Sequence, residues 1–277
     1  MRLFDLHIHT NFSDGLDSIE TIIDKALEKN IYGIAITDHD TIDAINYLSC
    51  NKIKFNNISI IPGIELSSDI NGEEVHILGY FIDCENINLN NELRRLKEDR
   101  FSRGLLILEK LSSLGLNLEI DSIINEAKII NNGFIGRAFI ARKLVSYGFV
   151  KDIKEAFDKY LGEDRPAYIN RNKLSLSDSI DLITKSSGIP VLAHPGMIKD
   201  KTIVKKTIEL GIKGIECFTS KHTKEDERYF VDVCKKNNLI ITGGSDYHGD
   251  KNNLGKFYTD IDEIELFKLK CFENKII

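Results

Sequence analysis

Two kinds of segment alternate along the chain: short apolar runs, and longer stretches in which apolar residues recur every three or four positions. Short apolar runs are typical of buried strands, and they lie at 3–7, 33–37, 58–65, 75–81, 190–194, 214–218 and 239–243. Helical spacing occurs at 17–29, 41–48, 177–187 and 224–236. This alternation indicates an α/β fold whose parallel sheet is covered on both faces, as in a barrel or a doubly wound sheet.

The first helical segment shows the pattern most clearly. Its apolar stripe consists of Ile19, Ile22, Ile23, Ala26 and Leu27. Asp17 and Glu20 have the spacing of a capping box, in which the first side chain caps the helix and the second bonds back to it. We therefore predict a helix over 17–29 that is capped by Asp17.

The middle of the chain differs, because no strand pattern is found between about 88 and 161. Leu93, Leu96, Arg100 and the run 105–114 predict one long helix. Shorter helices are expected at 120–130, 138–147 and 153–161, and the breaks between the helices contain Gly115, Gly133 and Gly148. We interpret residues 88–164 as a small all-helical insertion domain in an α/β body made of 1–87 and 165–277.

The charge balance excludes one class of partner. The 277 residues carry 37 Lys and Arg against 43 Asp and Glu, a net charge of −6. Proteins that bind long nucleic acid usually present a basic surface, so this balance argues against such a partner. Small phosphorylated substrates stay open, because bound metal ions reverse the local field.

Five cysteines lie far apart, at 50, 84, 217, 234 and 271, without a Cys-x-x-Cys pair. An odd number at wide spacing does not suit a disulfide framework, so we expect a reducing compartment. The first residues lack the apolar core of a signal peptide, and no apolar run reaches the roughly 18 residues of a membrane span. These features predict a soluble, cytoplasmic protein with no membrane partner.

Histidines and carboxylates gather at the predicted strands. His7 and His9 lie two apart at a strand end and share one face, while His39 and His194 end or follow later strands. In a parallel α/β barrel the carboxyl ends of the strands meet at one mouth. We therefore expect nine groups to meet there: His7, His9, Asp14, His39, Glu65, His76, His194, Asp246 and His248.

Such a cluster needs compensation, because neighbouring carboxylates repel one another and their burial is costly. Divalent cations provide it, and a mixed set of imidazoles and carboxylates without thiolates suits Zn, Mn or Fe. Nine ligands are too many for one ion and suffice for three, with Glu65 able to bridge two. Paired metals are a common hydrolytic device, in which a bridging water is deprotonated and attacks a phosphoryl group.

Each element also has a simpler interpretation. A lone His-x-His is weak, and Asp40 of Thr37-Asp38-His39-Asp40 could cap a helix. His76, flanked by Val and Ile, could be a core histidine. Asp246 and His248 could belong to a polar loop. These interpretations fail together, because six of the seven histidines would have to reach strand ends by chance.

The combined motifs resemble the polymerase and histidinol phosphatase (PHP) family of phosphoesterases. They are His7-x-His9, Asp14-Gly15, Thr37-Asp38-His39-Asp40, Gly63-Ile64-Glu65, His76, Ala193-His194-Pro195 and Ser245-Asp246-Tyr247-His248. The resemblance implies a distorted seven-stranded (β/α) barrel with a metal cluster at its mouth. It assigns His7, His9, Glu65 and Asp246 to one metal ion. Glu65, His76 and His194 would hold a second, and Asp14, His39 and His248 a third.

Two segments of the helical region narrow the resemblance. Residues 136–142 and 156–162 resemble the branch that acts on nucleoside 3′,5′-bisphosphates and on 5′ ends of short RNA. That branch usually has Gly-Arg-Pro-His, and here Ala138-Phe139 replaces Pro-His. We predict that the retained Arg137 is a phosphate clamp, since a guanidinium makes bidentate phosphate contacts. A surface arginine at a helix cap is the alternative.

Ser220-Lys221-His222-Thr223 resembles the family's Ser-x-His-Thr segment. His222 and Ser220 are therefore candidate contacts to a substrate phosphate. The alternative for His222 is a loop residue just before a helix that Thr223 caps. Asp38 and Asp40 are expected to support metal ligands from behind or to cap helices.

The expected activity is hydrolysis of a small phosphorylated nucleotide or a short RNA end. The resemblance implies three divalent ions, with Mn²⁺ as the first choice and Zn²⁺ or Fe²⁺ open, and Glu65, His194 and Asp246 as catalytic residues. A metal-bridging hydroxide would attack phosphorus, and a metal-bound water, His194 or His222 would protonate the leaving oxygen. The alternatives are a histidinol-phosphatase-like or other phosphomonoesterase, an amidohydrolase, and a non-catalytic metal-binding module.

Overall fold

The computed structural model describes residues 2–51, 58–130, 132–265 and 267. Cys271, one of the five cysteines, lies outside them. The strands are β1 Leu3–Ile8, β2 Gly33–Ile36, β3 Ser59–Ile70, β4 Glu73–Tyr80, β5 Leu174–Ser175, β6 Ile189–Leu192, β7 Gly214–Phe218, β8 Ile240–Gly243 and β9 Thr259–Asp260. They form one sheet in the order β8-β7-β6-β4-β3-β2-β1-β9, and β5 pairs with β3.

The sheet curves into a nearly closed barrel. Tyr247, just after β8, accepts a hydrogen bond from His9 N at 2.9 Å and donates its N–H to His7 O at 3.3 Å. These bonds join the end of β8 to β1. The expected count of seven strands differs from the nine in the described residues, of which β5 and β9 have two residues each. All of the predicted strands are present.

The expectation of a parallel sheet is correct only in part. β1, β2 and β3 are parallel, as are β6, β7 and β8, but β4 runs antiparallel to both β3 and β6. The reason is the tight turn at Asn71 and Gly72, whose φ angles of 54° and 85° join β3 and β4 as a hairpin. Because both strands are long, Glu65 and His76 lie within them and not at their ends.

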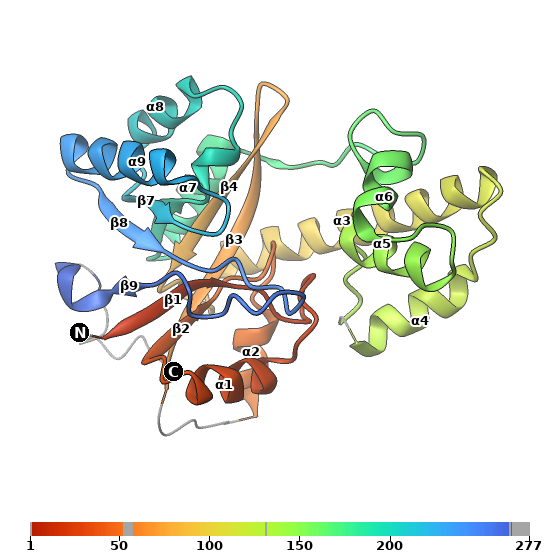
Figure 1. Ribbon diagram of the computed structural model, residues 1–277, viewed down its shortest axis with the longest axis horizontal. Coiled ribbons are helices and arrows are strands. Elements are labelled where there is room, and N and C mark those ends of the chain that lie inside the picture. The colour runs from red at the N-terminus through yellow and green to blue at the C-terminus, as the bar shows by residue number, and fades with distance from the viewer. Residues whose placement is uncertain (1, 52–57, 131, 266, 268–277) are drawn as a thin grey trace.

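Helices cover the barrel and form a separate group beside it, on the right of Figure 1. The α-helices are α1 Ile19–Glu28, α2 Asp43–Cys50, α3 Ile87–Ser113, α4 Ile120–Ile130, α5 Arg137–Ser146, α6 Ile153–Ala156, α7 Leu176–Lys185, α8 Thr202–Glu209 and α9 Lys224–Asn237. Three short helical turns are η1 Phe157–Leu161, η2 Pro195–Met197 and η3 Ile261–Glu263. Within the described residues no helix is long and apolar enough to cross a membrane.

Helix boundaries follow local capping. The predicted cap of α1 is wrong: Ser18 is the N-cap and its hydroxyl accepts from Thr21 N, while Asp17 accepts from Lys25 and Tyr247. The helix cap assumed in the alternative interpretation of His222 is present, because Thr223 forms a capping box with Asp226 at the start of α9. Helix α8 was not predicted.

Helix α3 belongs to two hydrophobic clusters. Leu89, Leu93 and Leu96 in its first half pack with residues of β3, β4, β6 and β7. Ile107, Leu108 and Leu111 in its second half pack with α4, α5, α6 and η1. The helical group therefore has a core of its own and shares one long helix with the barrel (Figure 1).

Candidate active site

All nine predicted ligand side chains meet at the mouth of the barrel. They form four overlapping groups in which the potential ligand atoms lie within 4.8 Å of one another. The groups are His9, Asp14, His39 and His248; His7, His9 and Asp246; His7, Glu65 and His194; and His39, Glu65 and His76. The structure thus brings the nine together in overlapping groups, in which His7, His9, His39 and Glu65 each appear twice. Their division into three sets of metal ligands stays a prediction.

Glu65 lies at the centre of the cluster and is fully buried. Its Oε1 is 2.9 Å from His76 Nδ1 and 3.0 Å from His194 Nε2. Its Oε2 is 3.0 Å from His39 Nδ1, 3.2 Å from His9 Nε2 and 3.4 Å from His7 Nε2. Burial alone would raise the pKa of Glu65, but the surrounding imidazoles hold it well below its usual range.

The donor set fits divalent metal ions. Several buried side-chain atoms here have no hydrogen-bond partner, among them His9 Nδ1, Asp14 Oδ1, His39 Nδ1 and Glu65 Oε2. Buried polar atoms are rarely left unpaired. These four face one another in two pairs: His9 Nδ1 lies 3.9 Å from Asp14 Oδ1, and His39 Nδ1 lies 3.0 Å from Glu65 Oε2. Imidazoles and carboxylates without thiolates are the ligands that Mn, Zn and Fe accept.

The carboxylates also draw protons to the imidazoles. Burial disfavours a charged His9, yet bonds to Asp246 and Glu65 outweigh it and raise the pKa of His9 to about 9. Burial likewise opposes a charged His76, and Glu65 with Glu74 raises the pKa of His76 to about 10. A cation is therefore stabilised at this position, either as a proton or as a metal ion.

Asp38 and Asp40 support the cluster without entering any of the four groups. Asp38 accepts hydrogen bonds from Thr10 N and Thr10 Oγ1, both at 2.7 Å, and so fixes the turn after His9. Asp40 does not cap α2. It binds Arg100, Arg171 at 2.5 Å and Ser67 N at 3.0 Å. Burial opposes ionisation, but the two guanidinium groups lower the pKa of Asp40 to about 2.

Sequence reasoning missed three carboxylates that touch the ligands. Glu216 on β7 accepts from His7 Nδ1 at 2.9 Å, and Glu74 Oε1 lies 3.1 Å from His76 Nε2. Asp5 on β1 accepts from Ser245 N at 2.8 Å, and burial raises its pKa to about 6. The available signal for Glu216 was a single charged residue inside an otherwise apolar strand, Gly214–Phe218; Glu74 follows Glu73 at the start of its strand and has no such signal.

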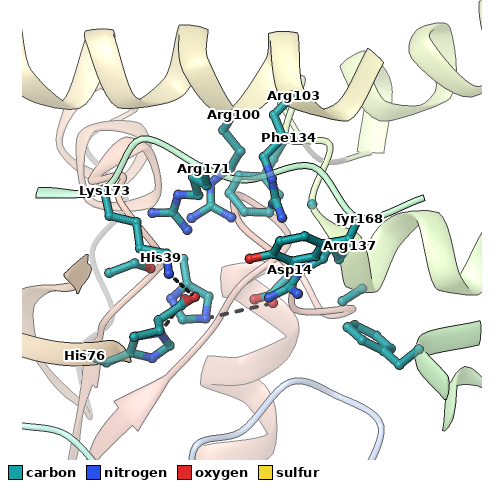
Figure 2. Close-up of a pocket in the computed structure, with 15 residues that line it drawn as sticks. Asp14, His39, His76, Arg100, Arg103, Phe134, Arg137, Tyr168, Arg171 and Lys173 are labelled. Atoms are coloured by element: carbon teal, nitrogen blue, oxygen red, sulfur yellow. Dashed lines mark hydrogen bonds and ion pairs between the residues drawn. The ribbon is translucent and has the colours of Figure 1, made fainter. Parts of the chain in front are cut away.

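A basic pocket adjoins the candidate metal ligands. Asp14, His39 and His76 line one side of it, and Figure 2 shows Arg100 and Arg103 reaching towards them from α3. The cations that line the pocket are Arg100, Arg103, Arg137, Arg171 and Lys173. Only Arg137 was predicted. Its guanidinium lies 5.7 Å from the ring centres of Phe157 and Tyr168, and it donates one weak bond, to Leu161 O at 3.4 Å.

Of Ala138 and Phe139, which stand in place of Pro-His, only the first lines the pocket. Ala138 lines the pocket, but Phe139 is 2% exposed and packs in the helical core. Phe139 therefore contributes to the core of the helical group and not to the lining of this pocket.

His222 and Ser220 have partners other than an open phosphate site. His222 Nδ1 donates to Cys217 O and Nε2 accepts from Gly196 N, both at 2.9 Å. Ser220 Oγ donates to Ser245 O at 3.4 Å. The residue between them reaches the cluster instead: Lys221 Nζ lies 3.1 Å from Asp246 Oδ2 and lines the pocket above Glu65 and His194.

Comparison with known proteins agrees with this geometry. A 5′-3′ exoribonuclease Rnm of Salmonella typhimurium is 30% identical over 255 residues, which cover 89% of this chain and 85% of that protein. A 3′,5′-nucleoside bisphosphate phosphatase of Chromobacterium violaceum is 30% identical over 253 residues, 90% of this chain and 88% of the relative.

A solved structure shares the fold over almost the full length. It is described as an amidohydrolase from Chromobacterium violaceum with bound sulfate, and it has a TM-score of 0.85 and 27% identity. The match covers 99% of this chain and 97% of that one. The family model of the PHP domain matches residues 5–161. This chain belongs to the PHP family.

Proposed function

We propose that this protein is a metal-dependent phosphoesterase that hydrolyses small phosphorylated nucleotides. The observation that carries the proposal is one continuous site with two halves, a cluster of metal-ligating side chains and a wall of cations. A phosphate on the metal side and a second phosphate on the cationic side would both be neutralised. Two relatives are named for a nucleoside bisphosphate and for RNA, which agrees with such a substrate.

The proposed fold is the PHP barrel, with residues 88–164 as a helical insertion domain. This domain supplies Arg100, Arg103 and Arg137 to the wall of cations, while Arg171 and Lys173 come from the segment that follows it. We propose three divalent ions, Mn²⁺ first, held by the nine residues of the cluster. Such ions supply an activated water at neutral pH and neutralise charge on a phosphoryl group. Glu65 would be shared between ions because both of its oxygens face imidazoles. We expect Glu65, His194 and Asp246 to be essential for activity.

The chain's own cations bind and orient the substrate. Arg137 lines the same pocket as Asp14 (Figure 2) and offers a guanidinium to a phosphate. Lys221 contacts Asp246 Oδ2 and adds positive charge to the pocket that Glu65 and His194 also line. The net charge of −6 favours a small substrate or an RNA end over long nucleic acid, in the cytoplasm that the cysteine pattern favours.

The test is phosphate release from adenosine 3′,5′-bisphosphate with added Mn²⁺, beside histidinol phosphate and a 5′-phosphorylated RNA oligomer. Asp14→Ala should abolish turnover, because Asp14 lies within reach of His248 at 3.2 Å in one ligand group. Asp24→Ala, at an exposed position of α1, serves as the matched control. Whether the bisphosphate or the RNA is hydrolysed shows which of the two proposed substrate types the protein acts on.

A second candidate is hydrolysis of an amide, because the similar solved structure is described as an amidohydrolase. The same assay therefore includes an N-acyl amino acid. If no phosphate ester is hydrolysed while Mn²⁺ is shown to be bound and the amide is cleaved, amide hydrolysis replaces the phosphoesterase proposal.

A further inference from the structure

The turn that carries His194 has an unfavourable backbone conformation. His194 follows β6, and its φ of 28° and ψ of 55° lie in the left-handed region that residues other than glycine rarely adopt. Such a conformation costs free energy and persists only where neighbouring groups hold it. Two side chains, Glu216 and His222, bind the backbone of this turn.

Glu216 holds the first residue of the turn, His194. This carboxylate is fully buried on β7, and its Oε2 accepts from His194 N at 2.9 Å. Its Oε1 accepts from His7 Nδ1 at 2.9 Å. His7 and His194 belong to the same ligand group around Glu65, and their rings stack with centres 5.7 Å apart. One carboxylate thus orients two members of one candidate metal site.

His222 holds the turn two residues further on. Cys217 O accepts from Nδ1, so Nδ1 carries the proton and Nε2 is the acceptor for Gly196 N. The ring packs on Phe230 with centres 5.1 Å apart. A Cβ at position 196 would lie 2.5 Å from Cδ2 of His222, so this approach requires glycine. The N–H groups of residues 194 and 196 therefore both end on side chains supplied by β7 and the loop after it.

We propose that Glu216 and His222 form a clamp on this turn, and that they are positioning residues which aim His194 at the metal site. This inference rests on the proposed function, since it takes His194 and His7 as metal ligands. It gives His222 a role that differs from a contact to substrate. Partners of this kind that orient a ligand typically change metal affinity 10- to 100-fold when they are lost.

The test measures Mn²⁺ affinity by equilibrium dialysis for the wild type, Glu216→Gln and His222→Phe. Glutamine offers one acceptor and one donor, so it cannot accept from both His7 and His194 N. We expect its affinity for at least one Mn²⁺ to fall by about tenfold or more. Phenylalanine keeps the ring and loses the acceptor for Gly196 N, so we expect a smaller loss of affinity, a lower kcat and an unchanged KM.

Gly196→Ala provides an independent route to the same effect, because the new methyl group pushes the ring of His222 away. We expect it to reproduce the loss seen in His222→Phe. Glu227→Gln is the matched control, a buried glutamate on α9 whose partner is Lys224. Melting temperatures in EDTA verify that each variant folds.

The outcomes separate the two proposals. If the wild type binds no Mn²⁺, the proposed function fails. If the wild type binds Mn²⁺ and all three variants bind it equally well, only the clamp is wrong. A raised KM for adenosine 3′,5′-bisphosphate in His222→Phe, with unchanged Mn²⁺ affinity, would show that His222 contacts substrate and would also overturn the clamp.

Discussion

Individual side chains in this site combine burial with charge, and Arg137 illustrates the functional side of that combination. Its guanidinium lies 5.7 Å from the centres of two aromatic rings and donates one long hydrogen bond, to a backbone carbonyl oxygen. A phosphate would offer it a charged, bidentate partner. The pocket thus holds a cation in place without neutralising it.

We expect Arg137→Met to raise KM for adenosine 3′,5′-bisphosphate by about tenfold, because a hydrogen bond to a charged group contributes roughly 1.5–3 kcal/mol. The change in kcat should be smaller. Arg137→Lys should recover part of the affinity, since lysine keeps the charge but loses the planar fork. Steady-state phosphate release measures both constants. Arg165→Met, at an exposed position, is the control, and an unchanged KM in Arg137→Met would remove this residue from the substrate site.

Asp40 illustrates the structural side. Two arginines that are 9% and 8% exposed share its Oδ2, so removing the charge leaves both without their carboxylate. We expect Asp40→Asn to lower the free energy of unfolding by about 3 kcal/mol at pH 7. The exposed pair of Asp181 and Lys185 is the control, and Asp181→Asn should cost almost nothing.

The pH dependence of that loss has a definite sign. The folded-state pKa of Asp40 is lowered to about 2 from its usual 3.8, so its contribution is complete above about pH 4 and disappears as pH falls towards 2. The difference between wild type and Asp40→Asn should therefore shrink by roughly 2 kcal/mol across this window. Urea unfolding of the metal-free proteins measures it. A difference that stays constant would contradict the assigned pKa.

Sequence reasoning found the residues that meet at the barrel mouth as candidate metal ligands, but it did not find these arginines. Imidazoles and carboxylates that follow apolar strands are visible in one dimension, because the ends of parallel strands must meet. Arg100 and Arg171 belong to a helix and a loop that are 60 and 131 residues from Asp40 in the chain. In sequence they are indistinguishable from solvated charges on a helix face.

Single elements show how local sequence can oppose local propensity. Gly104 lies inside α3, where glycine costs up to about 1 kcal/mol relative to alanine. A Cβ there would lie 2.6 Å from Cγ2 of Ile135, on the segment that also carries Phe134 and Gly136 of the pocket. Close packing of α3 on this segment explains the glycine.

We expect Gly104→Ala to destabilise the protein by about 1–3 kcal/mol in spite of its better helix propensity, because overpacking shifts the backbone. It should also raise KM, since Arg100 and Arg103 on the same helix line the pocket. Ser102→Ala, at an exposed position of α3, should leave both unchanged. A higher free energy of unfolding for Gly104→Ala than for the wild type would show that α3 and Ile135 are loosely packed at this position.

The direction of a strand is the part of an element that sequence hides best. The run 75–81 predicts a strand correctly, yet only the turn at Asn71 and Gly72 reverses it against β3. Asn-Gly is a hairpin signal, and here it follows a strand that is longer than predicted. That reversal lays His76 opposite Ser67, within reach of Glu65.

The barrel positions a cluster of charged side chains, so removal of bound metal ions should lower the stability of the whole molecule. We expect EDTA to lower the melting temperature, since any ligand of the folded state alone stabilises it, by about 2.7 kcal/mol at 100 times Kd. Readdition of Mn²⁺ should restore both the melting temperature and the activity.

The size of this effect should grow with pH. The pKa values of His9 and His76 are raised to about 9 and 10, so their protons stabilise the metal-free protein near pH 6.5 and are lost as pH rises towards 9–10. Metal binding must displace the same protons, so its affinity rises over that range. The gap between melting temperatures with Mn²⁺ and with EDTA should widen from pH 6.5 to 8.5. A gap that narrows would contradict this linkage.

Because helix α3 belongs to both the barrel and the helical group, it also decides where a segment of this chain can be replaced by the matching segment of a relative. A graft that cuts at residue 88 would remove Leu89, Leu93 and Leu96 from the barrel together with the donor's helices. A junction after Leu96 keeps those leucines with their strands and transfers Ile107, Leu108 and Leu111 with the helical group. Positions 100, 103 and 137 then travel with the grafted part. A chimera of this design would therefore combine the donor's residues at these three positions with Arg171, Lys173 and the candidate metal ligands of the recipient barrel.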